Sequence, residues 1–219
     1  MKVAFFDTKP YDVPGFDHYA AAADLEIKYF ETRLNADTVS LASGFDAVCV
    51  FVNDTVDSAV VEKLYEMGVK VIALRCAGFN NVDIRAASGK LPVYRVPAYS
   101  PYAVAEHAMA LALAANRRIC KAYIKVRNNN FSLDGLLGHN LYGAAAGIVG
   151  TGRIGAAMAR ICYGFGMTVL ACDKYQNPAL ADIARYVTPE ELLRTADLVS
   201  LHCPLTADTY HLINADTIQ

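Results

Sequence analysis

The sequence predicts an α/β protein built from two doubly wound parallel sheets, and three observations predict it. Short runs of β-branched and apolar residues alternate with helical stretches, as in strands joined by crossover helices. The run 47–52 is apolar at every position, which is typical of a strand covered on both faces. A glycine-rich turn beginning at Gly150 then starts a second series of strands and helices.

The first unit is predicted to take residues 1–98. Five runs read as strands, and the last ends just before Pro97, where the alternation stops. The predicted strands are 2–6, 25–30, 47–52, 69–74 and 92–96.

The second unit is predicted to take residues 99–219. Ser100 and Pro101 form an N-cap followed by proline in the first helical position, and apolar residues continue through Ala115. The stretch 128–143 contains three glycines and is predicted to be a loop. Further strands are expected at 145–149, 168–172 and 198–202, with helices beginning at Arg153, Pro189 and Asn214.

Composition excludes several classes of protein. Twenty Lys and Arg stand against 22 Asp and Glu, and a net charge of −2 leaves no basic excess for a nucleic acid. No apolar run approaches the roughly 18 residues of a membrane span, and the apolar start is too short for a secretion signal. We therefore expect a cytoplasmic protein with reduced cysteines, no metal site, and neither nucleic acid nor membrane as a partner.

The segment 145–155 predicts a phosphate-binding turn between a strand and a helix. Gly150 would make the tight turn, Gly152 would let the backbone approach a pyrophosphate, and Gly155 would let the helix pack closely on the strand. The N-terminus of the helix would offer free N–H groups and the positive end of its dipole to the phosphates.

Asp173 follows the next predicted strand, close to the expected distance of about 20 residues beyond the glycines. Its carboxylate would accept hydrogen bonds from the ribose and repel a 2′-phosphate, which favours NAD over NADP. The alternative is that Asp173 only caps a surface turn, but the surrounding strand, turn and helix favour the cofactor role.

Six blocks in order along the chain resemble the D-isomer-specific 2-hydroxyacid dehydrogenase family, and within it the fermentative D-lactate dehydrogenases of bacteria. The blocks are 75–83 (RCAGFNNVD), 96–107 (VPAYSPYAVAEH), 116–118 (NRR), 149–155 (VGTGRIG), 164–166 (GFG) and 200–205 (SLHCPL).

The resemblance implies a flavodoxin-like substrate-binding domain followed by the N-terminal part of a Rossmann NAD-binding domain. It implies that the turn formed by Cys76, Ala77 and Gly78 presents backbone amides to the substrate carboxylate, and that Tyr99 closes over the substrate. The resemblance also implies cofactor contacts besides the three glycines and Asp173, namely Val104, Arg153, Ile154, Cys203, Pro204 and Thr209.

The function implied is NADH-dependent reduction of pyruvate, or of a related 2-oxo acid, to the D-2-hydroxy acid by a homodimer. The family's catalytic arginine, acidic residue and histidine would follow Gln219, so no catalytic residue is assigned and residues 1–219 alone are expected to be inactive. His202 is interpreted as a structural residue.

Two alternatives stay open: a non-catalytic, NAD-responsive protein similar to a corepressor, and a dehydrogenase for a bulkier 2-hydroxy acid or phosphoglycerate. Nothing near Asn53, residues 76–79 or Tyr99 supplies the extra cations expected for a phosphorylated substrate.

Overall fold

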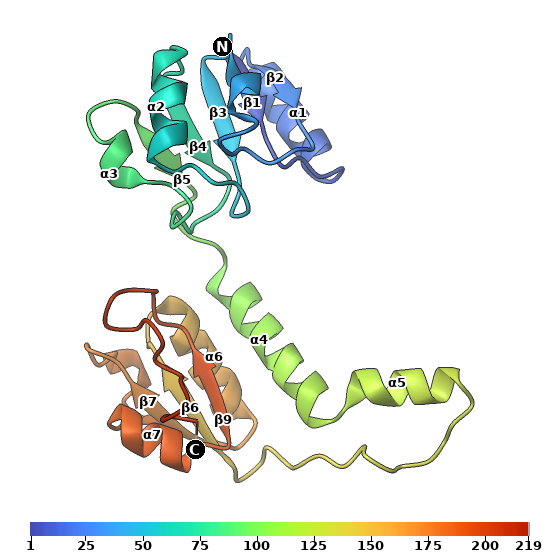
Figure 1. The fold of residues 1–219 in the computed structure, drawn as a ribbon. Helices are drawn as coiled ribbons and strands as arrows, with labels where there is room; N and C mark the ends of the chain where they lie inside the picture. The colour runs from blue at the N-terminus through green and yellow to red at the C-terminus, as the bar shows by residue number, and fades with distance from the viewer. Residues whose placement is uncertain (219) are drawn as a thin grey trace. The chain divides into compact units, whose positions relative to one another are not determined.

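The computed structural model describes residues 1–218 and divides into two compact units (Figure 1). The first unit is Met1–Tyr99 and the second begins at Ser100. None of the helices within residues 1–218 combines the length and the hydropathy needed to cross a bilayer.

The first unit contains a five-stranded parallel sheet in the order β2-β1-β3-β4-β5. The order reverses between β1 and β3, as in flavodoxin-like folds, and ligands of such sheets bind beyond the carboxyl ends of the strands near that reversal. The strands are β1 (Lys2–Phe5), β2 (Glu26–Tyr29), β3 (Ala47–Val50), β4 (Val71–Leu74) and β5 (Val93–Arg95).

Both faces of this sheet are covered by apolar side chains. On one face Phe16 of α1 packs with Phe5 of β1 and Tyr29 of β2. The other face carries the larger core, which includes the fully buried Leu64 of α2. Asp57 begins α2 because its carboxylate accepts from the N–H of Val60. The helices are α1 (Asp12–Ala22), α2 (Ser58–Glu66) and α3 (Ile84–Ala87), with a 3-10 turn η1 (Val39–Ala42).

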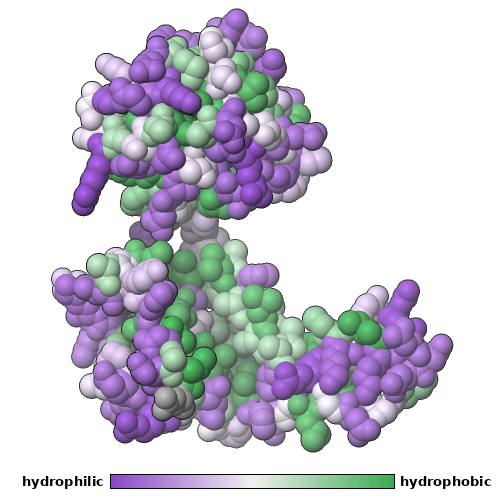
Figure 2. Space-filling model, in the orientation of Figure 1, coloured by the Kyte–Doolittle hydropathy of each residue, from purple (hydrophilic) through white to green (hydrophobic). Residues whose placement is uncertain are grey.

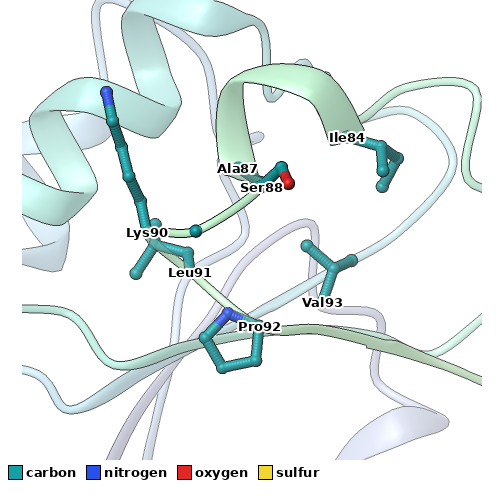
Figure 3. Close-up of a pocket in the computed structure, with 8 residues that line it drawn as sticks. Ile84, Ala87, Ser88, Lys90, Leu91, Pro92 and Val93 are labelled. Carbon is teal, nitrogen blue, oxygen red and sulfur yellow. The ribbon is translucent and has the colours of Figure 1, made fainter.

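An open pocket of about 500 Å³ lies where α3 leads into β5 (Figure 3). Ile84, Pro92 and Val93 form part of the pocket lining, whereas the Lys90 side chain extends away from these residues in Figure 3. The Lys90 ammonium pairs with Glu62 on α2. Because the pocket lies at the amino end of β5, it is at the edge of the sheet opposite to the expected ligand-binding edge.

The second unit contains a four-stranded parallel sheet in the order β8-β7-β6-β9. In chain order these are the third, second, first and fourth strands of the unit, which is the arrangement of the first four strands of a Rossmann fold. The strands are β6 (Ala145–Val149), β7 (Thr168–Cys172), β8 (Ala184–Tyr186) and β9 (Leu198–Leu201).

Helices cover both faces of the second sheet. Ala105 and Met109 of α4 are buried in a core shared with α6, whereas Leu192 of α7 is buried against the opposite face. Ser100 begins α4 by accepting from the N–H of Ala103. The elements are α4 (Pro101–Asn116), α5 (Ile119–Arg127), α6 (Arg153–Gly164) and α7 (Pro189–Thr195), with a 3-10 turn η2 (Pro178–Leu180).

The predicted fold class is confirmed, and every predicted strand begins and ends within two residues of the observed one. Among the strands and α-helices of the second unit, two were not predicted. The strand β8 has only three residues, Ala-Arg-Tyr, without β-branched side chains, and α5 follows α4 after a break at Arg118, whose φ of 53° is left-handed.

The helix predicted from Asn214 is wrong within the described residues. The side chain of Asn214 accepts from the N–H groups of Asp216 and Thr217 at 2.8 and 3.2 Å and forms a local turn. Such side-chain turns compete with helix formation. Gln219, which the predicted helix included, lies outside the described residues.

Candidate functional site

The turn between β6 and α6 brings backbone atoms so close together that two of its residues must be glycine. Gly150 has a φ of +87°, and a Cβ atom there would lie 2.6 Å from the backbone N of Cys203. A Cβ atom on Gly155 would overlap the carbonyl oxygen of Gly150. The glycines therefore let the first turn of α6 pack against the end of β6 and beside the residues that follow β9.

The start of α6 has free backbone donors, because the first N–H groups of a helix have no intrahelical acceptor. Among the hydrogen bonds of residues 1–218, none uses the N–H of Arg153, Ile154 or Gly155. Gly152 has open space where its Cβ would be, and the first turn contains no acidic residue. Three unpaired amides at the positive end of a 12-residue helix fit the pyrophosphate of a dinucleotide.

Asp173 follows β7, and its carboxylate accepts hydrogen bonds from Thr151 of the same turn. Its Oδ2 accepts from the N–H of Thr151 at 2.5 Å and from the Thr151 hydroxyl at 3.0 Å. Its Oδ1 accepts from the N–H of Tyr175 at 3.1 Å. Burial by itself would raise the pKa of Asp173, but these donors outweigh burial and hold the pKa below its ordinary value. The residue is therefore a carboxylate at neutral pH, as a ribose-binding residue must be.

His202 closes the turn on the side of β9. Its Nε2 lies 2.8 Å from the hydroxyl of Ser200, and its Cβ is within 3.4 Å of the position that a Cβ on Gly155 would take. Burial lowers the pKa of His202, so the imidazole is neutral at pH 7. The His202 side chain therefore packs beside the turn, held by its hydrogen bond to Ser200, and adds no positive charge.

The first unit presents a second candidate site beyond the end of β4. Cys76 is buried, and its thiol donates to the carbonyl of Gly78 at 3.3 Å. The N–H of Ala77 donates to the hydroxyl of Tyr99 at 2.7 Å, whereas the N–H of Gly78 has no acceptor among residues 1–218. The turn thus has one amide bonded to the Tyr99 oxygen and a second, on the exposed Gly78, that is free for an anion.

Arg75 fixes the start of this turn. Its guanidinium donates to the carbonyls of Phe6 and Asp7 at 3.0 and 2.7 Å and lies over the rings of Phe5 and Phe51. Both hydrogen bonds cross from β4 to the end of β1. Arg75 is therefore a structural link between the strand ends.

The expectation that this region lacks cations is wrong. Arg95 donates to the carbonyl of Ala77 at 3.0 Å and lies 5.3 Å from the centre of the Phe79 ring. Asn53 and Lys9 both bond to Asp7, with Lys9 at 2.8 Å. The sequence could not reveal these neighbours, because strand pairing and the loop after β1 bring them together.

The structure brings only some of the predicted cofactor residues together. Cys203 meets Gly150, and Arg153 and Ile154 lie in the first turn of α6. Val104 is partly exposed on α4. The hydroxyl of Thr209 instead donates to the carbonyl of Pro204 at 2.6 Å and closes the loop after β9.

Sequence analysis missed three polar residues that hold the turn, Thr151, Asn177 and Tyr186. Asn177 donates from Nδ2 to the carbonyl of Thr151, and the hydroxyl of Tyr186 contacts that of Thr151. Thr151 lies inside the glycine motif and could have been noticed there. Tyr186 carries no sequence signal, because β8 was not predicted.

Residues 109–219 match the family model described as the D-isomer specific 2-hydroxyacid dehydrogenase, NAD binding domain. This chain belongs to that family. NAD is thus the cofactor of the family domain to which the β6–α6 turn and Asp173 belong.

Other members of the 2-hydroxyacid dehydrogenase family match almost the whole chain. The D-lactate dehydrogenase of Escherichia coli (strain K12) is 49% identical over 216 residues, which are 98% of this chain and 66% of that protein. A 2-hydroxyacid dehydrogenase homolog of Haemophilus influenzae is 47% identical and covers 99% of this chain. The chain spans about 66% of the length of both curated relatives.

Solved structures of the family share the fold. The apo-structure of D-lactate dehydrogenase from Escherichia coli aligns with a TM-score of 0.91 and 48% identity, covering 99% of this chain and 69% of that one. The D-lactate dehydrogenase of Aquifex aeolicus, solved with NAD and lactic acid, aligns with a TM-score of 0.84 and 32% identity over 98% of this chain and 64% of that one.

The packing at Gly155 leads to a prediction with a matched control in the same helix. Gly155→Ala should destabilise the protein by about 1–3 kcal/mol or more and weaken NADH binding, because the new methyl group overlaps the Gly150 carbonyl. Gly164→Ala has open space and should be neutral or stabilising by up to about 1 kcal/mol. Urea denaturation and NADH titration measure both effects, and equal stabilities for the two variants would contradict the packing argument.

Proposed function

We propose that the whole protein is an NAD-dependent dehydrogenase that reduces pyruvate, or a related small 2-oxo acid, to the D-2-hydroxy acid. The observation that carries the proposal is the β6–α6 turn, with its unpaired amides beside the Asp173 carboxylate, in a chain of this family. The relatives named as D-lactate dehydrogenases support the substrate class. The activity is proposed for the whole protein because the chain spans about 66% of its curated relatives.

In this proposal the second unit binds and orients the dinucleotide. The N–H groups of Arg153, Ile154 and Gly155 hold the pyrophosphate, and the free lone pair of Asp173 accepts from a ribose hydroxyl. When bound, the nicotinamide ring supplies the hydride that reduces the substrate carbonyl. Because His202 is neutral, the positive potential at the phosphates comes from the N-terminus of α6 and not from this histidine.

The first unit supplies the carboxylate-binding amides in the same proposal. Ala77 is partly exposed and Gly78 is exposed, and the N–H of Ala77 donates to the hydroxyl of Tyr99. A substrate carboxylate oxygen would replace the Tyr99 hydroxyl on the Ala77 amide and gain a charge-assisted hydrogen bond. Arg95 adds a positive charge beside the turn, which favours an anionic substrate.

We further propose that the protein is a homodimer formed through α4, α5 and the loop 128–143. Of the nine described residues of α5, none is buried, and Ile119, Tyr123 and Ile124 are each more than half exposed. Leu133 and Leu137 in the loop are also exposed. Figure 2 shows hydrophobic residues gathered along α4. Apolar side chains on one helix and the adjoining loop are typical of a surface that a second copy covers.

The test of the enzymatic proposal is direct. The full-length protein should oxidise NADH in the presence of pyruvate, which is followed by absorbance, and chiral chromatography should identify the product as D-lactate. NADH binding without turnover of pyruvate or of bulkier 2-oxo acids would contradict the enzyme and favour the NAD-responsive binding protein.

Replacing Asp173 should alter cofactor choice. Asp173→Ala should raise the Kd for NADH by about 10-fold or more, because a hydrogen bond to a charged group is worth about 1.5–3 kcal/mol. The Kd for NADPH should change less, since the repulsion of the 2′-phosphate is also removed. The control is the exposed Asp182→Ala on the same unit. If the ratio of the Kd values for NADH and NADPH is the same in both variants, Asp173 is not a ribose-binding residue.

Charging the surface of α5 should dissociate the dimer. Ile124→Lys places a charge on a residue that is 58% exposed and should leave a folded monomer, since an unpaired buried charge is costly at an interface. Ile84→Lys, on a residue 41% exposed in the first unit, should leave the dimer intact. Sedimentation velocity at micromolar concentration distinguishes the two species. A monomeric wild type would contradict the proposed homodimer.

A further inference from the structure

The last residue of β8 connects to the cofactor turn through its hydroxyl group. Tyr186 Oη accepts from the N–H of Asn177 at 2.7 Å and contacts Thr151 Oγ1 at 3.0 Å. The tyrosine is half-buried at the edge of the second sheet. Its two partners lie in the segment after β7 and in the glycine turn, so one hydroxyl joins three separate segments.

Thr151 passes the connection on to Asp173. The residue is only 2% exposed, and its hydroxyl lies 3.0 Å from Asp173 Oδ2. Its carbonyl accepts from Asn177 Nδ2 at 2.8 Å, and its N–H donates to the same Asp173 oxygen. Every polar group of Thr151 therefore has a partner, and all of these partners lie outside the turn itself.

The direction of each hydrogen bond follows from the number of protons available. A carboxylate has no proton, so Thr151 Oγ1 must donate to Asp173 and can only accept from Tyr186. Tyr186 then donates its single proton to Thr151 and accepts from Asn177. All donors therefore point in the same direction along the chain, from Asn177 through Tyr186 and Thr151 to Asp173. Hydrogen bonds in such a chain polarise and strengthen one another.

We propose that Tyr186 is a positioning residue for the dinucleotide, which acts through Thr151 to fix the Asp173 carboxylate that receives the adenosine ribose. The inference rests on the proposed cofactor role of Asp173. It adds a residue that lies outside the glycine motif and on a strand the motif does not include.

Counting acceptor sites explains what this arrangement does. A carboxylate offers about four lone-pair sites. Thr151 occupies both on Oδ2, and the N–H of Tyr175 occupies one on Oδ1. One site on Oδ1 remains for a ribose hydroxyl. A 2′-phosphate has no such proton to donate and adds charge repulsion, so the fixed carboxylate favours NAD.

Removing the Tyr186 hydroxyl should release this arrangement without removing the carboxylate. In Tyr186→Phe the Thr151 hydroxyl loses its donor and can rotate away from Asp173. The Kd for NADH should rise about 3–10-fold, as expected for one lost hydrogen bond, while the Kd for NADPH changes less than about 2-fold. The ratio of the two constants is the decisive readout, because a general loss of structure would weaken both dinucleotides equally.

A double-mutant cycle tests whether Tyr186 acts through Thr151. Thr151→Val removes the hydroxyl that receives the Tyr186 proton, so adding Tyr186→Phe should weaken NADH binding no further. Thr151→Ser keeps the hydroxyl and should bind NADH as the wild type does. Additive effects in the double variant, or equal changes for NADH and NADPH, would overturn the inference.

The matched control is Tyr163→Phe, since Tyr163 is 54% exposed on α6 and its hydroxyl has no hydrogen bond among residues 1–218. It should leave both constants unchanged. All measurements use the full chain, with NADH fluorescence as the probe and the thermal unfolding midpoint as a check on folding.

A measurement without cofactor separates this inference from the proposed function. Weakening the donors to Asp173 should raise its pKa in Tyr186→Phe, which a carbon-detected NMR titration of the carboxyl group can follow. An unchanged Asp173 pKa would overturn the positioning role. If the Asp173 pKa rises in Tyr186→Phe but the wild type does not bind NADH, the proposed cofactor function is overturned and the positioning role is not.

Discussion

The close approach of α6 to the end of β6 is the constraint on which the second unit depends. Because the Gly155 position lies against the Gly150 carbonyl, the first turn of α6 comes down directly onto the sheet. That approach buries the small side chains of α6 against α4 and places Cys203 beside the turn. The first amides of α6 have no intrahelical partner, as at the start of any helix, and the open space at Gly152 leaves them accessible to a candidate anion.

Polar groups then stabilise a turn that has little side-chain volume of its own. Thr151 is the only described residue of the turn 150–152 with a polar side chain, and it is held by Asp173, Asn177 and Tyr186. These bonds keep the pKa of Asp173 low despite burial, so the turn carries unpaired amides and a carboxylate side by side. Such donors and acceptors distinguish ligands by the groups with which each ligand can donate or accept a hydrogen bond.

In the first unit an arginine side chain links the carboxyl ends of two strands. Arg75 crosses from β4 to the end of β1, and its guanidinium lies against the rings of Phe5 and Phe51. Two of its donors bond to backbone carbonyls and the guanidinium also pairs with Asp12, so the residue holds the strand ends together. In both proposed sites the candidate anion-binding groups are backbone amides, held in place by the side chains around them.

The sequence by itself determined the parallel sheets, the glycine turn and Asp173, because apolar strand runs and the spacing of the glycines are local patterns that can be read along the chain. The contacts that require glycine, such as that of Gly150 with Cys203, come from the tertiary structure. The sequence also carried the family resemblance through short blocks in order. Only the tertiary structure decided which groups meet Asp173, since Tyr186 comes from a strand of three residues with weak β propensity and reaches Thr151 by strand pairing. The same holds for Arg95, which only the pairing of β4 with β5 places beside Ala77. Hydrogen bonds between segments far apart in sequence depend on packing, which no local pattern records.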